Sequence, residues 1–201
     1  MVENDLMLFD LLLPAPCVVC GKLPKPICIS CIPRPVVQTE ELMGIPLFYA
    51  GKLDKNLEIL ITSYKDSHRV AVEPVLIGLL NQVVGQMLST IHFDAYAIPP
   101  RNKKNYRRRG FHPIERLAQR SCLSKVPQVF SFSNRKISDQ RELAAKERLG
   151  NTNMAFSLKR GQGDLVLVDD VLTTGATVSE LARAATEAGF RVRAVCVIAR
   201  R

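Results

Sequence analysis

Four cysteines near the N-terminus have the spacing of metal ligands. They form two Cys-x-x-Cys pairs, Cys17 with Cys20 and Cys28 with Cys31, separated by seven residues. Two such pairs can present four thiolates to one tetrahedral zinc ion. Disulfides are less favoured because the sequence has no export signal, while a redox pair, an iron–sulfur site and a vestigial site remain alternatives. We expect a structural zinc site in a compact loop that folds only with its metal.

A second cluster joins two acidic residues to a bend rich in threonine and glycine. Residues 165–168 form an apolar run of strand length, Asp169 and Asp170 follow it, and residues 173–177 (Thr-Thr-Gly-Ala-Thr) lead into a helical pattern. Backbone amides in such a bend converge on an anion, and the helix start adds the positive end of its dipole. Carboxylates accept hydrogen bonds from hydroxyls. A ribose 5-phosphate satisfies both halves, whereas a simple acidic turn before a helix is the structural alternative.

A third cluster is strongly basic. Residues 101–109 carry six positive charges and no acid, and we expect them to form a loop. Arginine recognises pyrophosphate oxygens in a bidentate way, and an excess of positive charge also suits a nucleic-acid backbone. The alternative is a solvated basic loop. The candidate residues for pyrophosphate or nucleic acid are Arg101, Lys103, Lys104, Arg107, Arg108 and Arg109.

The elements that must position these clusters alternate between strands and helices. We expect strands at 47–50, 94–98, 128–132, 165–168 and 192–199, and helices at 1–13, 54–65, from Pro74 onward, at 112–122 and at 177–188. This order predicts an α/β fold with a largely parallel sheet. We divide the chain into an N-terminal helix and zinc-binding module, 1–46, and an α/β domain, 47–201. Cys122 and Cys196 lie in apolar patterns and are interpreted as core residues.

Composition bounds the class of protein. The 201 residues are 47% hydrophobic and 23% charged, with a net charge of +9, which excludes disorder over most of the chain. No apolar run reaches the roughly 20 residues needed to span a bilayer. Glu3, Asp5 and Asp10 interrupt the apolar N-terminus, which therefore lacks the pattern of a secretion signal. We expect a cytoplasmic protein without membrane insertion.

Residues 165–177 resemble the signature of type I phosphoribosyltransferases, enzymes that use phosphoribosyl pyrophosphate (PRPP). The resemblance implies a type I phosphoribosyltransferase fold, a mostly parallel sheet flanked by helices. It also implies that Asp169 and Asp170 are the catalytic pair and hold the ribose hydroxyls, and that Mg²⁺ arrives with the pyrophosphate. Thr173 stands where 6-oxopurine salvage enzymes carry an acid, which argues against that substrate. The implied PRPP-binding residues are Asp169, Asp170, Val171, Thr173, Thr174, Gly175, Ala176 and Thr177.

The ordered set of motifs resembles the ComF family, which is linked to natural competence and close to the GntX group. It comprises the cysteine pairs, the 109–111 segment (Arg-Gly-Phe) with Glu115, and the C-terminal signature. Tyr64-Lys65 also matches, but Asp66 replaces a glycine, and His112-Pro113 replaces Asn-Gln. The resemblance also covers a hood loop with Arg135, Gln140 and Arg148.

Two hypotheses about function follow. The chain is either a Mg²⁺-dependent phosphoribosyltransferase of unknown acceptor, a nucleotide-salvage enzyme being one form of it, or a non-catalytic module that binds single-stranded DNA or senses PRPP. The resemblance places both in DNA uptake and natural transformation. The zinc module is expected to dock on the α/β domain or to present a surface to a partner such as a competence helicase.

Overall fold

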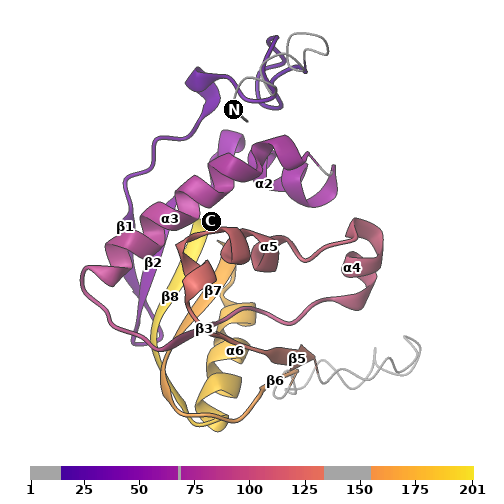
Figure 1. The fold of residues 1–201 in the computed structure, drawn as a ribbon. Coiled ribbons are helices and arrows are strands. Elements are labelled where there is room, and N and C mark those ends of the chain that lie inside the picture. The colour runs from indigo at the N-terminus through magenta and orange to yellow at the C-terminus, as the bar shows by residue number, and fades with distance from the viewer. Residues whose placement is uncertain (1–14, 68, 134–154) are drawn as a thin grey trace.

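The computed structural model describes residues 15–67, 69–133 and 155–201 (Figure 1). The strands are β1 (Gln38–Leu42), β2 (Ile45–Lys52), β3 (Ala95–Ala97), β4 (Gln128–Val129), β5 (Ser131–Ser133), β6 (Phe156–Leu158), β7 (Gly163–Leu172) and β8 (Phe190–Arg200). The helices are α2 (Lys55–Asp66), α3 (Glu73–Leu88), α4 (Lys103–Arg109), α5 (Pro113–Arg120) and α6 (Ala176–Glu187). The first expected helix, 1–13, lies outside the described residues.

Six strands form one sheet in the order β1-β2-β8-β7-β3-β4. All neighbours from β2 to β4 pair in parallel, and only β1 pairs antiparallel, with β2. β5 and β6 form a separate antiparallel pair beside the main sheet. The expected α/β fold with a mostly parallel sheet is therefore confirmed.

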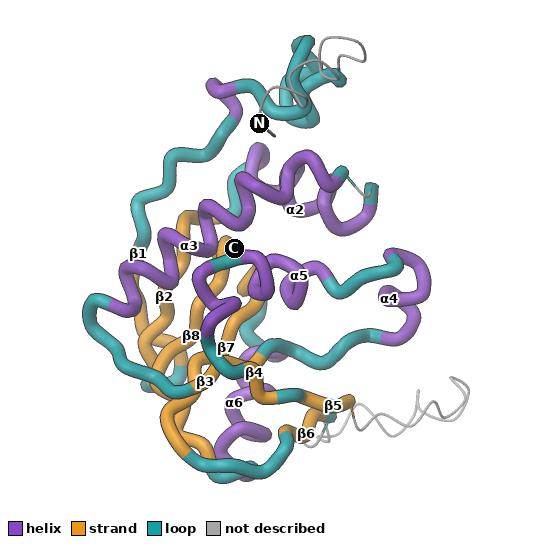
Figure 2. The backbone as a smooth tube through the Cα atoms, viewed as in Figure 1, coloured by secondary structure: helices purple, strands orange, loops and turns teal. Residues whose placement is uncertain are grey.

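Helices cover both faces of the sheet (Figure 2). On one face, Val166 and Val168 of β7 pack in a core cluster with residues of α2, α3 and α5. On the other face, Leu165 and Leu167 pack with residues of α6. Alternate residues of β7 are thus apolar on both sides, because a parallel strand between two helix layers meets no solvent. The continuous apolar run in the sequence has this physical cause.

Local sequence signals place most helix ends. The side chain of Asp54 accepts a hydrogen bond of 2.8 Å from the backbone N–H of Leu57, and so caps α2. Pro74 lies in the first turn of α3, where its missing N–H costs nothing. Gly189 has φ 102° just beyond α6, a conformation that favours glycine.

Val70–Leu88, which is α3 with the 3-10 turn before it, is the one helical stretch in the described part of the chain that is long and apolar enough to pass for a membrane span. Seven residues of α3 are buried, and its apolar stripe packs against the sheet beside α5. The helix therefore has the contacts of a core helix, which explains its apolar composition.

Three expectations need correction. Residues 103–109 form a helix rather than a loop. Cys122 is exposed, because α5 ends at Arg120 and Cys122 starts a 3-10 turn outside the core. Cys196, in contrast, is buried as expected. The sheet begins at Gln38, so its first strand lies before the expected domain boundary at residue 47.

Candidate functional site

The two aspartates lie inside β7 rather than after it. β7 continues to Leu172, and the backbone of Asp169 pairs with Val197 of β8. Val168 and Val171 pack against the same core cluster although they are three residues apart, which breaks the strict alternation of a strand. The break falls on Asp169 and Asp170. Val171 is thereby held in the sheet and the core instead of the expected ligand bend.

The threonine–glycine bend keeps the geometry of an anion site. Gly175 has φ 80° and stands at the N-cap position of α6, a left-handed conformation that favours glycine. Within the described residues, the backbone N–H groups of Gly175 and Thr177 have no hydrogen-bond acceptor, whereas that of Ala176 contacts Thr174 Oγ1 at 3.4 Å. Thr173, Thr174 and Thr177 are exposed. Free amides and hydroxyls at a helix start are suited to binding a phosphate.

A cleft of about 190 Å³ brings the acidic pair, the helix start and basic residues together. It is lined by Asp169 and Asp170 of β7, Thr177 of α6, Lys65 of α2 and Arg109 of α4. Lys65 Nζ lies 2.7 Å from Asp170 Oδ2, and both side chains are mostly buried. The acidic cluster with its threonine–glycine bend and the basic cluster thus meet in one cleft, and Lys65 joins them.

α4 forms because its two ends are capped. Asn102 Oδ1 accepts a hydrogen bond of 3.1 Å from the backbone N–H of Asn105, and Gly110 takes φ 73° at the other end. Lysine and arginine have high helix propensity, and the three arginines fall in the last turn, where the helix dipole favours positive charge. The cap and the glycine were readable from the sequence, but the density of charge made the segment resemble a loop.

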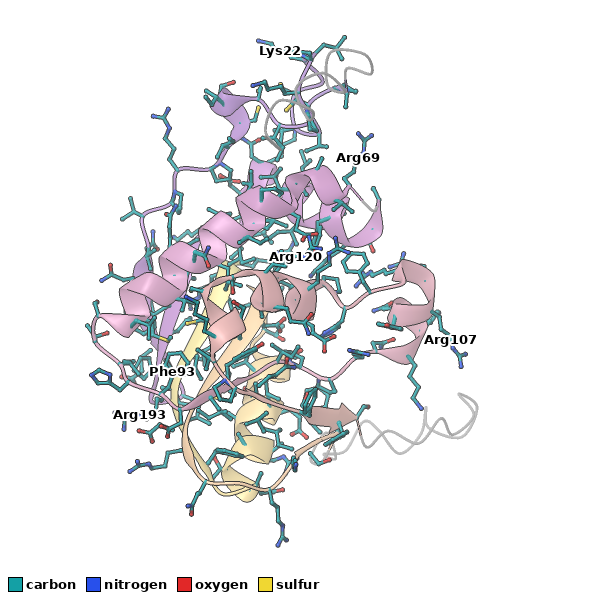
Figure 3. All side chains as sticks on the ribbon, viewed as in Figure 1. Lys22, Arg69, Phe93, Arg107, Arg120 and Arg193 are labelled. Atoms are coloured by element: carbon teal, nitrogen blue, oxygen red, sulfur yellow. The ribbon has the colours of Figure 1, made fainter. Side chains whose placement is uncertain are left out.

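Three of the six basic residues in the 101–109 segment form ion pairs with acidic side chains. Arg101 forms a bidentate pair with Glu115, with N–O distances of 2.9 Å. Arg108 and Arg109 both contact Asp66. Among the described residues, Lys103, Lys104 and Arg107 have no ion-pair partner, and Figure 3 shows Arg107 projecting from α4 away from the body of the molecule.

Two larger clefts, each of about 620 Å³, share Pro99 and Pro100 with the smaller one. One lies against α6 and β6 and is lined by Thr177 and Arg183. The other is lined by Lys103, Arg107 and the aromatic rings of Tyr106, Phe130 and Phe132. The end of β3 is therefore the point from which a ligand can extend in three directions.

His112 has a mostly buried imidazole, to which sequence reasoning assigned no role. Its Nδ1 is buried and, among the described residues, has no hydrogen-bond partner; it lies 3.9 Å from Glu115 Oε2. Burial lowers the pKa of His112 despite the nearby carboxylate, so the imidazole is neutral at physiological pH. His112 lines both the acidic cleft and the aromatic cleft.

The acidic pair provides oxygen ligands that suit Mg²⁺. Burial and then the neighbouring Asp170 raise the pKa of Asp169, which makes its ionised form costly without a compensating cation. Magnesium prefers one or two carboxylates together with ligand oxygens and water. Asp169 and Asp170 would hold such an ion, which would neutralise charge on a diphosphate.

The four N-terminal cysteines form a metal-binding geometry. Their sulfur atoms all lie within 4.8 Å of one another, and Cys20 and Cys28 sulfurs are 3.6 Å apart. Zn–S bonds of about 2.3 Å in a tetrahedron place sulfurs roughly 3.8 Å apart, so the four can hold one zinc ion. Burial opposes ionisation of Cys17, but backbone N–H groups of Cys20 and Cys28 outweigh it and lower the Cys17 pKa to about 6. This favours a thiolate ligand.

The expected hood residues Arg135, Gln140 and Arg148 lie outside the described residues. Sequence reasoning missed Lys65 and Asp66 as site residues, although the matched Tyr64-Lys65 pair was the available signal. Their roles follow only from the packing of the C-terminal end of α2 against β7 and α4.

The fold and the site define the chain as an α/β protein with a mostly parallel sheet, helices on both faces and a four-cysteine module. It is 30% identical to Competence protein F of Haemophilus influenzae (strain ATCC 51907 / DSM 11121 / KW20 / Rd) in an alignment of 161 positions that covers 75% of this chain and 70% of that protein. The chain therefore belongs to the family of Competence protein F, as the ordered motifs predicted. No family model matches the chain.

Solved phosphoribosyltransferases are among the structures similar to it. An adenine phosphoribosyltransferase has a TM-score of 0.45 and 10% identity over 82% of this chain and 85% of its own. The orotate phosphoribosyltransferase of Aeropyrum pernix has a TM-score of 0.41 and 21% identity, over 81% and 73% of the two chains.

Proposed function

We propose that the chain binds PRPP together with Mg²⁺, acts as a phosphoribosyltransferase, and serves DNA uptake in the cytoplasm. The observation that supports this most is the cleft in which Asp169, Asp170, Thr177, Lys65 and Arg109 meet. The cleft brings together carboxylates that can accept hydrogen bonds from ribose hydroxyls, a hydroxyl that can donate to a phosphate, and positive charge. The membership in the family of Competence protein F supports the role in uptake.

In this proposal each group of the site has one task. The amides and hydroxyls of the 173–177 bend bind the 5-phosphate, and Asp170 accepts hydrogen bonds from ribose hydroxyls after Lys65 is displaced. Arg109 lies where it can bind the pyrophosphate that leaves C1, and charge stabilised there lowers the barrier to bond cleavage. Mg²⁺, when bound, neutralises the pyrophosphate.

The test compares two aspartates of one strand. PRPP binding is measured by calorimetry, with and without Mg²⁺, for wild type, Asp170→Asn and Asp164→Asn. Asp164 lies at the other end of β7 and pairs with Arg191, so it controls for the loss of a charge. We expect Asp170→Asn to weaken PRPP binding at least about tenfold, because a hydrogen-bonded anionic acceptor is lost, and Asp164→Asn to bind like wild type. Equal binding by all three would refute the proposal.

Turnover needs a separate measurement. Pyrophosphate release from PRPP is followed with candidate nucleobases and amines, using Asp170→Asn as the inactive control. Release by the wild type at the same slow rate as by Asp170→Asn would reduce the chain to a PRPP-binding module.

A second candidate function is binding of single-stranded DNA. Lys103, Lys104 and Arg107 are exposed on α4 without an acid partner in the described structure. The rings of Phe130 and Phe132 are 57% and 53% exposed, and both line the cleft that Lys103 and Arg107 also line. Basic groups beside exposed rings suit a strand whose bases stack.

Salt titration distinguishes the two functions. Binding of an oligothymidylate is measured at several salt concentrations for wild type and for the triple variant Lys103→Ala, Lys104→Ala, Arg107→Ala. We expect the slope of log binding constant against log salt concentration to be shallower in the variant. The slope should fall by about one unit for each phosphate that the variant no longer neutralises. An unchanged affinity and slope would exclude this surface as the DNA-binding site.

A competence helicase is a proposed partner of the cysteine module. The test is whether Cys17→Ser loses helicase binding.

A further inference from the structure

Two adjacent residues of opposite charge end α2 and link it to both halves of the site. Lys65 contacts Asp170 of β7, with 2.7 Å between nitrogen and oxygen. Asp66, the next residue, contacts Arg108 and Arg109 of α4. The last turn of α2 therefore supplies a cation to the acidic side of the cleft and an anion to its basic side.

One oxygen atom of Asp66 accepts hydrogen bonds from both arginines. Its Oδ1 accepts hydrogen bonds from Arg108 Nη2 at 2.7 Å and from Arg109 Nη2 at 2.8 Å and Nε at 3.3 Å. Burial alone would raise the pKa of Asp66, but Arg109 and Arg108 hold it below its ordinary value. The carboxylate is thus ionised over the whole physiological range, and it occupies these guanidinium groups as an anionic ligand would.

The position of Arg109 makes this contact relevant to the site. The arginine side chain is only 15% exposed and lines the same cleft as Asp170 and Thr177. A guanidinium in such a position can pair with a diphosphate in a bidentate way. It cannot give the same N–H groups to Asp66 and to a ligand at once.

We propose that Asp66 is a positioning residue that competes with the anionic end of the ligand for Arg108 and Arg109. This competition sets the affinity of the cleft for diphosphate. Without ligand, Asp66 holds α4 against α2 and keeps the arginines paired. A diphosphate that enters the cleft displaces the carboxylate from Arg109. The inference rests on the proposed function, because it requires that this end of the cleft receives the pyrophosphate group.

The test measures binding of inorganic pyrophosphate, without magnesium, by calorimetry. Wild type is compared with Asp66→Asn, which removes the competing charge, and with Asp66→Glu, which keeps it. Glu58→Gln is the matched control: Glu58 lies on the same helix and pairs with Arg201 at 3.0 Å. We expect Asp66→Asn to bind pyrophosphate about fivefold more tightly, with a steeper dependence on salt, since one local negative charge is lost. Asp66→Glu and Glu58→Gln should stay within about twofold of wild type.

A gain of affinity is a result that damage to the fold would not produce. Equal or weaker binding by Asp66→Asn would overturn the inference, and so would an equal gain in Glu58→Gln. If pyrophosphate binds neither wild type nor Asp66→Asn while PRPP binding still depends on Asp170, the inference fails and the proposed function stands. If Asp66→Asn gains affinity for pyrophosphate but Asp170 is irrelevant to PRPP, only the proposed function fails.

Discussion

Asp169 and Asp170 are neighbours in the chain with different electrostatic environments. Asp170 has an ammonium group 2.7 Å away on Lys65. Asp169 has no such partner in the described structure; its own Oδ1 accepts the backbone N–H of Asp170 at 2.8 Å. The two carboxylates are therefore unequal before any ligand binds, and the buried one carries the cost of ionisation.

That inequality predicts how stability depends on pH. Because burial and Asp170 raise the pKa of Asp169 in the folded state, this carboxyl group binds more protons in the folded chain than in the unfolded chain above about pH 4. The free energy of unfolding should fall as pH rises from there to the raised pKa, by at most about 1.4 kcal/mol per pH unit. In Asp169→Asn this component should vanish.

Urea unfolding of wild type and Asp169→Asn at several pH values measures the effect. We expect the two stability profiles to approach each other toward acid pH and to separate toward alkaline pH, with the variant more stable there. Asp164→Asn controls for general charge effects. Parallel profiles for wild type and Asp169→Asn would contradict the assigned cause.

Glu73 is a buried carboxylate with a structural task. Its side chain is 2% exposed and pairs with Arg116 at 2.8 Å and Arg120 at 2.6 Å, so it ties α3 to α5. We expect Glu73→Gln to lower the free energy of unfolding by about 2 kcal/mol, because two guanidinium groups lose a buried partner but remain partly solvated. Glu187→Gln, at an exposed pair on α6, should cost less than about 0.5 kcal/mol. Equal costs in chemical unfolding would show that the Glu73 pairs contribute no more than surface pairs.

At the scale of the elements, two glycines with positive φ end helices in different surroundings. Gly110 follows α4 with φ 73°, and a methyl group there would meet open space. Gly189 follows α6 with φ 102°, and a methyl group there would overlap the carbonyl oxygen of Gly161. The first position tests the backbone conformation alone, and the second adds a clash with another backbone segment.

Alanine substitutions should separate these two causes. Gly110→Ala is expected to cost about 1 kcal/mol of stability, since only the left-handed conformation is penalised. Gly189→Ala should cost at least about 2 kcal/mol, because the adjacent turn at Gly161 must also move. Thermal unfolding of both variants provides the comparison. An equal loss of stability in the two variants would mean that the backbone at Gly161 moves away from the added methyl group at no cost.

The elements also show how far the sequence can predict this structure. The buried strands β7 and β8, the Asp54 cap and the Pro74 start are local signals, and each predicted its element. α4 was missed because charge density dominated the expectation, although Asn102 and Gly110 mark its ends. β1 forms a hairpin with β2 across the turn at residues 43–44, and its alternate residues are mostly exposed, so it lacks the apolar pattern of the other strands. The exposure of Cys122 depends on where α5 stops, which periodicity does not record. Within the site, the pairing of Lys65 with Asp170 required the tertiary arrangement.

On the scale of the whole molecule, the cysteine module is attached to the core rather than separate from it. Val18, Val19 and Ile27 of the module pack against the core cluster that contains α2 and α3. Figure 1 shows this segment beside the ends of those helices. The loss of a metal should therefore affect the helix layer as well as the module.

Metal content and thermal stability test this arrangement. The purified chain should contain about one zinc ion, which Cys17→Ser loses and Cys122→Ser retains, since Cys122 is exposed and remote from the cluster. A chelator should lower the melting temperature of wild type by a few degrees, because binding stabilises only the folded state. A metal-free chain with an unchanged melting temperature would exclude the structural zinc site.

The strand order has a consequence for how the chain is made. β8 lies between β2 and β7 in the sheet, yet it follows both of them in the sequence. During synthesis the hairpin of β1 and β2 emerges early and cannot join β7 until β8 has left the ribosome. The nascent protein must therefore keep one edge of β2 and one edge of β7 unpaired until β8 has been synthesised, and unpaired strand edges are sites of aggregation.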